Sequence, residues 1–139
     1  MIPLFETTIP MALPSRPNLE RSHWQRQKLV KKQNRSMGSV LVHATPPPLP
    51  VIVQLVRISP RMLDGDNLVG SVKACRDSIA RWLGSKDDRQ YKEIRWVYGW
   101  KKDTKRRPGY QALEVKVFAW EPMQLFGKEV FEAVIEVGT

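Results

Sequence analysis

The segment Val51–Ile58 constrains the fold of this chain more than any other. It reads Val-Ile-Val-Gln-Leu-Val-Arg-Ile, is rich in β-branched residues, and has prolines on both sides. Such a run between two chain breakers is typical of a buried β-strand. Apolar residues in 67–83 then recur at helical spacing up to Gly84, which indicates a helix soon after this strand. A strong strand followed by a helix predicts a chain that combines β and α structure.

Weaker patterns elsewhere extend this prediction to an α+β fold with a mixed β-sheet and two main helices. The further expected elements are a strand in Leu4–Leu13, a helix in His23–Ser36, a proline loop at Thr45–Pro50, and strands at Glu93–Tyr98 and Gln111–Trp120. The basic turn Lys101–Gly109 joins the last two strands, so we expect them to pair as a long hairpin. The length of 139 residues suits one domain, which we assign to residues 1–120. Two alternatives stay open for the C-terminal extension 121–139: a last strand at Val130–Val137, or a mobile tail.

No segment reads as a targeting signal or a membrane span. The opening Met1–Ser15 lacks a basic lead and contains three prolines and Glu6. Residues 36–56 carry no Lys, Arg, Asp or Glu, but four prolines in this stretch would break a spanning helix. The chain has one cysteine and two histidines, which excludes an internal disulfide framework and leaves carboxylates as the ligands for any metal. We expect a soluble cytoplasmic protein.

The charge of the chain is strongly positive and unevenly distributed. Lys and Arg number 23 against 14 Asp and Glu, a formal net charge of +9, which predicts a polyanionic partner such as nucleic acid or an acidic membrane surface. Residues 21–63 include no acidic side chain, and the second basic cluster, 95–107, is interrupted only by Asp103. Between the two clusters, acids appear abruptly at Asp64 and Asp66. An acidic island between basic flanks is therefore the pattern that a function must explain.

The acidic island lies between the strong strand and the best helix. If the chain is extended there, Asp64 and Asp66 point to the same side, and a pair of carboxylates suits Mg²⁺ or Mn²⁺. The alternative is structural: the two acids form a turn, with Asp66 as the helix N-cap. A calcium EF-hand is excluded because its positions six and twelve would be Val69 and Cys75. Too few residues follow Asp66 for a haloacid-dehalogenase-type phosphatase.

A second group of polar residues follows along the expected helix. Gly70, Lys73 and Asp77 lie four, seven and eleven residues after Asp66, which makes one helical stripe. Lys73 is predicted to reach a phosphate bound at the metal, with Gly70 leaving room for it. The alternative for Lys73 is a solvated salt bridge to Asp77. Another carboxylate pair, Asp87-Asp88, follows the helix.

Together these motifs resemble the RusA family of Holliday-junction resolvases. The residues that carry the resemblance are Asp64-Gly65-Asp66-Asn67-Leu68, the helical Lys73, Asp77 four residues later, Asp87-Asp88 after Trp-Leu-Gly, and the opening Leu13-Pro-Ser-Arg-Pro-Asn18. The similarity covers residues 5–120. Lys73 lies about one helical turn further along than the lysine of the family, which indicates a short insertion near Val69–Ser71.

The resemblance implies a RusA-like fold and a crossover junction endodeoxyribonuclease. Such an enzyme uses Mg²⁺, with Mn²⁺ as a substitute, to activate the water that attacks a phosphodiester, and it makes paired symmetric nicks in a four-way DNA junction. By the resemblance, Asp64, Asp66 and Asp88 are the metal-binding carboxylates, with Asp87 as the alternative to Asp88, and Lys73 is the essential lysine. It also implies a homodimer, which suits the two-fold symmetry of the junction, and a bacterial or phage-infected host cell.

The basic clusters are expected to hold the DNA backbone without reading its sequence. The candidate DNA-binding residues are Arg16, Arg21, Arg26, Lys28, Lys31, Lys32, Arg35, Lys101, Lys102, Lys105, Arg106 and Arg107. Trp24 and Trp100 would stack on unpaired bases or, alternatively, pack within the protein. Trp82 and Cys75 fall on the apolar stripe of the helix and are expected in the core.

Two other functions remain as alternatives. The chain would be a non-catalytic nucleic-acid-binding protein if its acids serve only as caps and turns. It would be a nuclease of the same fold with another substrate if it prefers flaps or forks to four-way junctions. DNA cleavage that depends on a divalent cation would distinguish the resolvase from the non-catalytic DNA-binding protein. Comparison of cleavage of four-way junctions, flaps and forks would distinguish it from the nuclease with another substrate.

Overall fold

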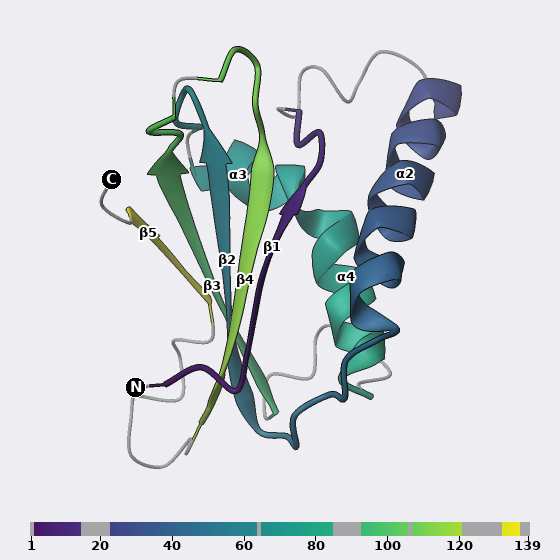
Figure 1. Ribbon diagram of the computed structural model, residues 1–139, viewed down its shortest axis with the longest axis vertical. Coiled ribbons are helices and arrows are strands. Elements are labelled where there is room, and N and C mark those ends of the chain that lie inside the picture. Colours follow the sequence, from purple (N-terminus) through teal and green to yellow (C-terminus); the bar gives the residue numbers. More distant parts are fainter. Residues whose placement is uncertain are drawn as a thin grey trace.

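The computed structural model describes residues 2–14, 23–63, 65–84, 93–105 and 107–120, together with the backbone of 132–136. The elements in this part of the chain are β1 (Phe5–Pro10), α2 (His23–Leu41), β2 (Val51–Ser59), α3 (Gly65–Ser71), α4 (Lys73–Trp82), β3 (Ile94–Lys102), β4 (Ala112–Ala119) and β5 (Glu132–Glu136). One mixed sheet with helices packed on one face confirms the α+β prediction (Figure 1).

The sheet has the strand order β1-β4-β2-β3-β5, so β2 lies at its centre. β2 and β3 are parallel, as are β3 and β5, whereas β4 runs antiparallel to both β1 and β2. The prediction that Glu93–Tyr98 and Gln111–Trp120 pair as a hairpin is therefore wrong. β2 separates these two strands, and it pairs along its whole length with β3 and along nearly all of it with β4.

The composition of β2 explains its central position. Val51, Val53 and Leu55 are buried on the face that packs against the helices, and Val56 is buried on the other face. A strand with buried side chains on both faces is stabilised by a neighbour on each side. The parallel pairing with β3 also needs a long crossover, which α3 and α4 supply between the two strands.

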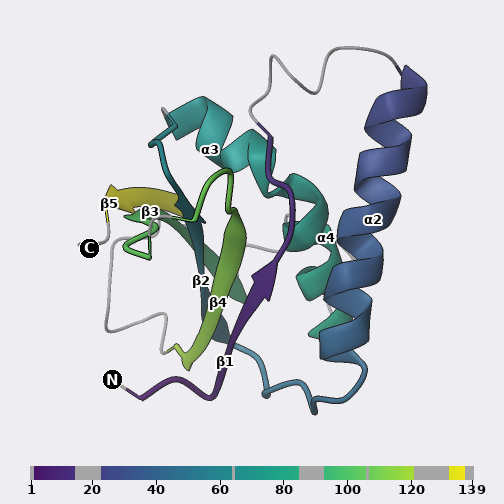
Figure 2. The ribbon, with the colours of Figure 1, turned by 45° about the horizontal axis from the view of Figure 1, so that its top comes forward.

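The helices form a layer over one face of the sheet, with α2 outside α4 (Figures 1 and 2). The single helix expected over 67–83 is divided at Val72, whose φ of −111° and ψ of 7° interrupt the helical path. The Ser71 hydroxyl donates to the carbonyl of Leu68 at 2.7 Å, and such a bond to the preceding turn competes with helical continuation. α3 consequently lies at the end of the sheet toward which β2 runs, while α4 turns back along its face (Figure 2).

The other face of the sheet carries a line of charged side chains. Lys116 lies 3.9 Å from Glu6 and 3.6 Å from Glu114, and Lys101 lies 3.9 Å from Glu114 on the other side. β5 at Glu132–Glu136 lies inside the range 130–137 that the pattern indicated for a last strand. None of the helices in the described segments is both long and apolar enough to cross a bilayer.

Candidate functional site

The chain between β2 and α3 is anchored by a buried arginine. The Arg57 guanidinium donates from Nε and Nη2 to the Leu13 carbonyl, and from Nη1 to the Arg61 carbonyl at 3.1 Å and to the Ser59 hydroxyl. Ser59 in turn donates to the Arg61 carbonyl at 2.7 Å and accepts from the Trp100 indole at 3.0 Å. Burial lowers the pKa of Arg57. This network fixes the segment that leads from β2 toward the acidic island.

Asp66 lies just beyond that segment, in the first turn of α3, and its side chain is exposed. The helix begins one residue earlier, at Gly65, so Asp66 is not its N-cap. An exposed carboxylate here suits a cation ligand, because it is turned to solvent rather than held by the core. It is also compatible with the structural alternative, since an acid in the first turn of a helix is favourable.

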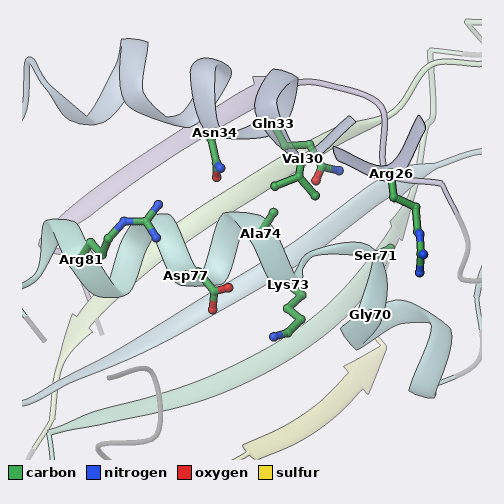
Figure 3. A pocket seen from close by; sticks show the side chains of 10 residues that line it. All are labelled: Arg26, Val30, Gln33, Asn34, Gly70, Ser71, Lys73, Ala74, Asp77 and Arg81. Carbon is green, nitrogen blue, oxygen red and sulfur yellow. The ribbon is translucent and has the colours of Figure 1, made fainter. Parts of the chain in front are cut away.

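Lys73 opens α4 and lines a pocket of about 420 Å³ between α2 and the α3–α4 junction (Figure 3). Its side chain is exposed. Gly70 and Asp77 line the same pocket, as do Arg26 and residues of α2. The structure thus brings Gly70, Lys73 and Asp77 together despite the helix break, whereas Asp66 is not among the lining residues.

The basic residues of α2 are all exposed and occupy its first two-thirds. They are Arg26, Lys28, Lys31, Lys32 and Arg35. The exposed Trp24 precedes them, and the Lys28 ammonium lies 5.3 Å from the centroid of its ring. The helix is anchored through the face opposite Lys28, Lys32 and Arg35, where Met37 and Leu41 are buried and Gln33 donates to the Ala12 carbonyl at 2.9 Å. The buried residues therefore fix α2 on the protein while its basic side chains are exposed to solvent.

The second basic cluster is less uniform than its sequence suggests. The Asp103 carboxylate is buried and accepts from the Arg107 side chain at 3.0 Å and from the backbone N–H groups of Lys105 and Arg107. These bonds, with that of the Arg107 side chain as the main cause, lower the pKa of Asp103. The Arg107 guanidinium also stacks on Tyr110 at 3.4 Å, so this arginine stabilises the turn. Lys101 pairs with Glu114 on the open face of the sheet, which leaves Lys102 and Lys105 as exposed cations here.

Several expected site residues lie outside the described residues. They are the carboxylates Asp64, Asp87 and Asp88 and the cations Arg16, Arg21 and Arg106. Within the described segments, no group of three or more His, Cys, Asp or Glu side chains is arranged to hold a metal ion. Of the expected ligands, Asp66 alone lies in the described residues, and its exposed carboxylate is accessible to a cation from solvent.

The tryptophans and the cysteine have distinct environments. Trp24 is 68% exposed, whereas Trp100 is half-buried with its indole bonded to Ser59. Trp82 is partly buried, packs on Phe5 at 4.8 Å between ring centroids, and donates to the Ala44 carbonyl. Cys75 is fully buried, as expected, with its sulfur 3.4 Å from that of Met11.

Two parts of the site were not anticipated from sequence. The Arg57 anchor had a usable signal, because Arg57 continues the inward-facing series Val51, Val53 and Leu55 at a position where a charge is unusual. Arg81 and Asn34 also line the pocket with Lys73. No sequence signal indicated these two, since their proximity depends on how α2 packs against α4.

Comparison with known proteins adds no family assignment. No model of a known protein family matches the sequence, and no curated protein matches it.

Proposed function

We propose that this chain is a divalent-metal-dependent endonuclease that cuts branched DNA, with a four-way junction as its preferred substrate. The observation that carries the proposal is the position of Lys73. It is exposed at the head of α4, shares a pocket with Arg26 of the basic helix, and follows directly after the helix that carries Asp66. A carboxylate, a lysine and a basic surface at one end of a sheet are the elements that phosphodiester hydrolysis requires.

The residues of the chain would have separate roles in this reaction. Asp66 would bind the metal together with Asp64 and Asp88, or with Asp87 in place of Asp88. A Mg²⁺ or Mn²⁺ ion held there would supply Lewis-acid chemistry and lower the pKa of a bound water. Lys73 would stabilise the negative charge that develops on the phosphoryl oxygens. The cations of α2 would hold the DNA backbone and give an affinity that falls with rising salt.

The resemblance to the RusA family also supports a homodimer, in which two sites would nick opposed strands of the junction. Light scattering on the purified chain tests this part. A mass of twice 16.1 kDa is expected, and a monomer at micromolar concentration would contradict it.

A non-catalytic DNA-binding protein is the alternative from another class. The exposed cations of α2 support DNA binding whether or not a metal binds, and Asp66 is equally well placed to stabilise the first turn of α3. A nuclease that prefers flaps or forks is the second alternative. The same exposed basic helix supports it, because contacts to the backbone do not distinguish one branched structure from another.

The test is cleavage of a labelled immobile four-way junction by the full chain, with Mg²⁺ and with EDTA, beside flaps, forks and linear duplex. Paired symmetric nicks are expected with Mg²⁺ only, and Asp66→Asn should abolish them while the protein still binds the junction. Lys73→Gln should lower the cleavage rate by roughly 100-fold or more. Tight binding without cleavage in Mg²⁺ or Mn²⁺ would favour the non-catalytic alternative, and faster cleavage of flaps would favour the other nuclease.

A further inference from the structure

A second hollow adjoins the pocket that contains Lys73. It has a volume of about 570 Å³ and is lined by His23, Arg26, Gln27, Val30 and Lys31. Two of these residues, Arg26 and Val30, also line the first pocket. Arg26 and Val30 thus border both hollows, and we refer to the two hollows together, from α4 to the N-terminal half of α2, as the track.

The track is electropositive along its length. Among the described residues that line it, the charged side chains are the cations Arg26, Lys31, Lys73 and Arg81 and the carboxylate Asp77, a formal surplus of three positive charges. All four cationic side chains are exposed. Figure 3 shows Arg81 at one end of the first pocket, Lys73 near its middle and Arg26 at the other end. An extended anion fits this arrangement better than a compact one.

The end of the track at Arg81 is held by hydrogen bonds. Arg81 donates from Nη2 to the Ser78 hydroxyl at 3.3 Å, and Ser78 donates to the Asn34 side chain at 2.8 Å. The bond between Ser78 and Asn34 links α4 to α2. Lys73 and Arg81 are eight residues apart, which is about 12 Å along a helix.

The geometry of α2 divides its basic residues into two sets. At 100° per residue, Arg26 lies among the other α2 residues that line the two hollows, and Lys31, 140° from Arg26, lies at the edge of this side. Lys28, Lys32 and Arg35 lie at about 180–240° from Arg26, on the opposite side. The five cations are thus not equivalent, although the sequence presents them as one cluster.

We propose that the track is the path of one DNA strand, with Arg81, Lys73, Arg26 and Lys31 in contact with its phosphates. The inference rests on the proposed function in that DNA is the ligand, and it adds Arg81 as a binding residue. It predicts that Arg26 contributes more to affinity than Lys32 on the far side of the same helix. Nothing in this inference depends on cleavage.

The test is the association constant for a fluorescent four-way junction in EDTA, measured over a range of KCl concentrations. Arg81→Gln and Arg26→Gln should each lower affinity roughly tenfold and reduce the slope of log K against log[salt] by about 0.9, the loss of one phosphate contact. Arg81→Lys, which keeps the charge, should keep the slope. Lys32→Gln should have a clearly smaller effect than Arg26→Gln. Lys116→Gln is the control for equal charge loss, because Lys116 is on the open face of the sheet.

The outcomes separate this inference from the proposed function. Equal losses of affinity in Arg26→Gln and Lys32→Gln, or a loss in Arg81→Gln no larger than that in Lys116→Gln, would contradict the proposed strand path. The proposed nuclease activity would then still be tested separately by Asp66→Asn. The expected salt slopes in a protein that never cleaves DNA would support the track and reject the nuclease. A wild-type chain that does not bind the junction would overturn both.

Discussion

Arg57 donates two hydrogen bonds to the backbone carbonyl of Leu13, 3.2 Å from Nε and 3.0 Å from Nη2, although 44 residues separate the two in the chain. The same guanidinium donates to the Arg61 carbonyl. One buried side chain thus ties the chain that follows β1 to the chain that follows β2. Because the second of these leads toward Asp66, the stability of the fold and the position of the candidate site depend on the same residue.

Arg57→Lys should lower the free energy of unfolding by about 2–3 kcal/mol. A lysine ammonium is a point charge, and it cannot reproduce the planar fork that reaches the Leu13 and Arg61 carbonyls together. Urea denaturation followed by circular dichroism measures the change. Arg61→Lys is the matched control, since the side chain of Arg61 is exposed and only its carbonyl takes part, so its effect should stay within about 0.5 kcal/mol. Equal stability of the two variants would contradict the anchoring role of Arg57.

The Cys75 thiol should resist Ellman's reagent at pH 8 in the native protein and react fully in denaturant. Burial raises its pKa from 9.0 to about 12, so the reactive thiolate is scarce and inaccessible. The chain has no other cysteine to complicate the signal. Rapid reaction of the native protein would show that this part of the core opens readily.

The same thiol predicts a loss of stability at high pH. The native state binds the thiol proton more tightly than the unfolded state. The contribution of the protonated thiol to the free energy of unfolding is therefore complete below pH 9 and is lost as the pH rises from about 9 to 12. The slope is about 1.4 kcal/mol per pH unit in that window. Wild type should therefore lose more stability than Cys75→Ala between pH 9 and pH 10.5, as measured by urea denaturation. Parallel pH profiles of the two proteins would contradict this account.

Most of the local elements could be predicted because their signals are local. The branched run at Val51–Ile58 and the apolar spacing after Leu68 depend only on neighbours in the sequence. The pairing of β3 was predicted wrongly because strand order depends on distant segments. A basic turn between two strands suits a hairpin, but the burial of β2 on both faces inserts it between them. The adjacent apolar residues Val51, Ile52 and Val53, and then Leu55 and Val56, are the local signal of that burial.

The residue types of the candidate site could be predicted from the sequence, but which of these residues lie together could be predicted only in part. Lys73 and Gly70 do share a pocket, although a helix break at Val72 separates them. The division of the α2 cations into two faces also follows from sequence once the helix is assumed. The arrival of Arg81 and Asn34 beside Lys73 does not, because it requires the packing of α2 on α4.

Gly70→Ala should stabilise the protein by up to about 1 kcal/mol. A Cβ at Gly70 meets no atom within 4 Å, and its backbone is not in the left-handed region, so alanine gains helix propensity without a clash. Gly84→Ala is the matched control. Gly84 has an equally open Cβ position, but its φ of 88° is strained for any L-residue, and a loss of about 1 kcal/mol is expected. Thermal unfolding of both variants tests the contrast, and a destabilised Gly70→Ala would show that the α3–α4 junction needs the freedom of glycine.

Trp24 should contribute to junction binding, and Trp100 should contribute to the stability of the fold. The exposed Trp24 has a ring face available for stacking, whereas the Trp100 indole is bonded to Ser59. Trp24→Ala should leave the free energy of unfolding within about 0.5 kcal/mol of wild type and weaken junction binding by about 1–3 kcal/mol. Trp100→Phe should do the reverse, with a loss of about 1 kcal/mol in stability and unchanged affinity. Fluorescence anisotropy with a labelled junction and urea denaturation measure the two quantities on each variant. If Trp24→Ala binds the junction as tightly as wild type, the exposed ring has no role in DNA binding. Its contact with Lys28 is then the contribution that remains.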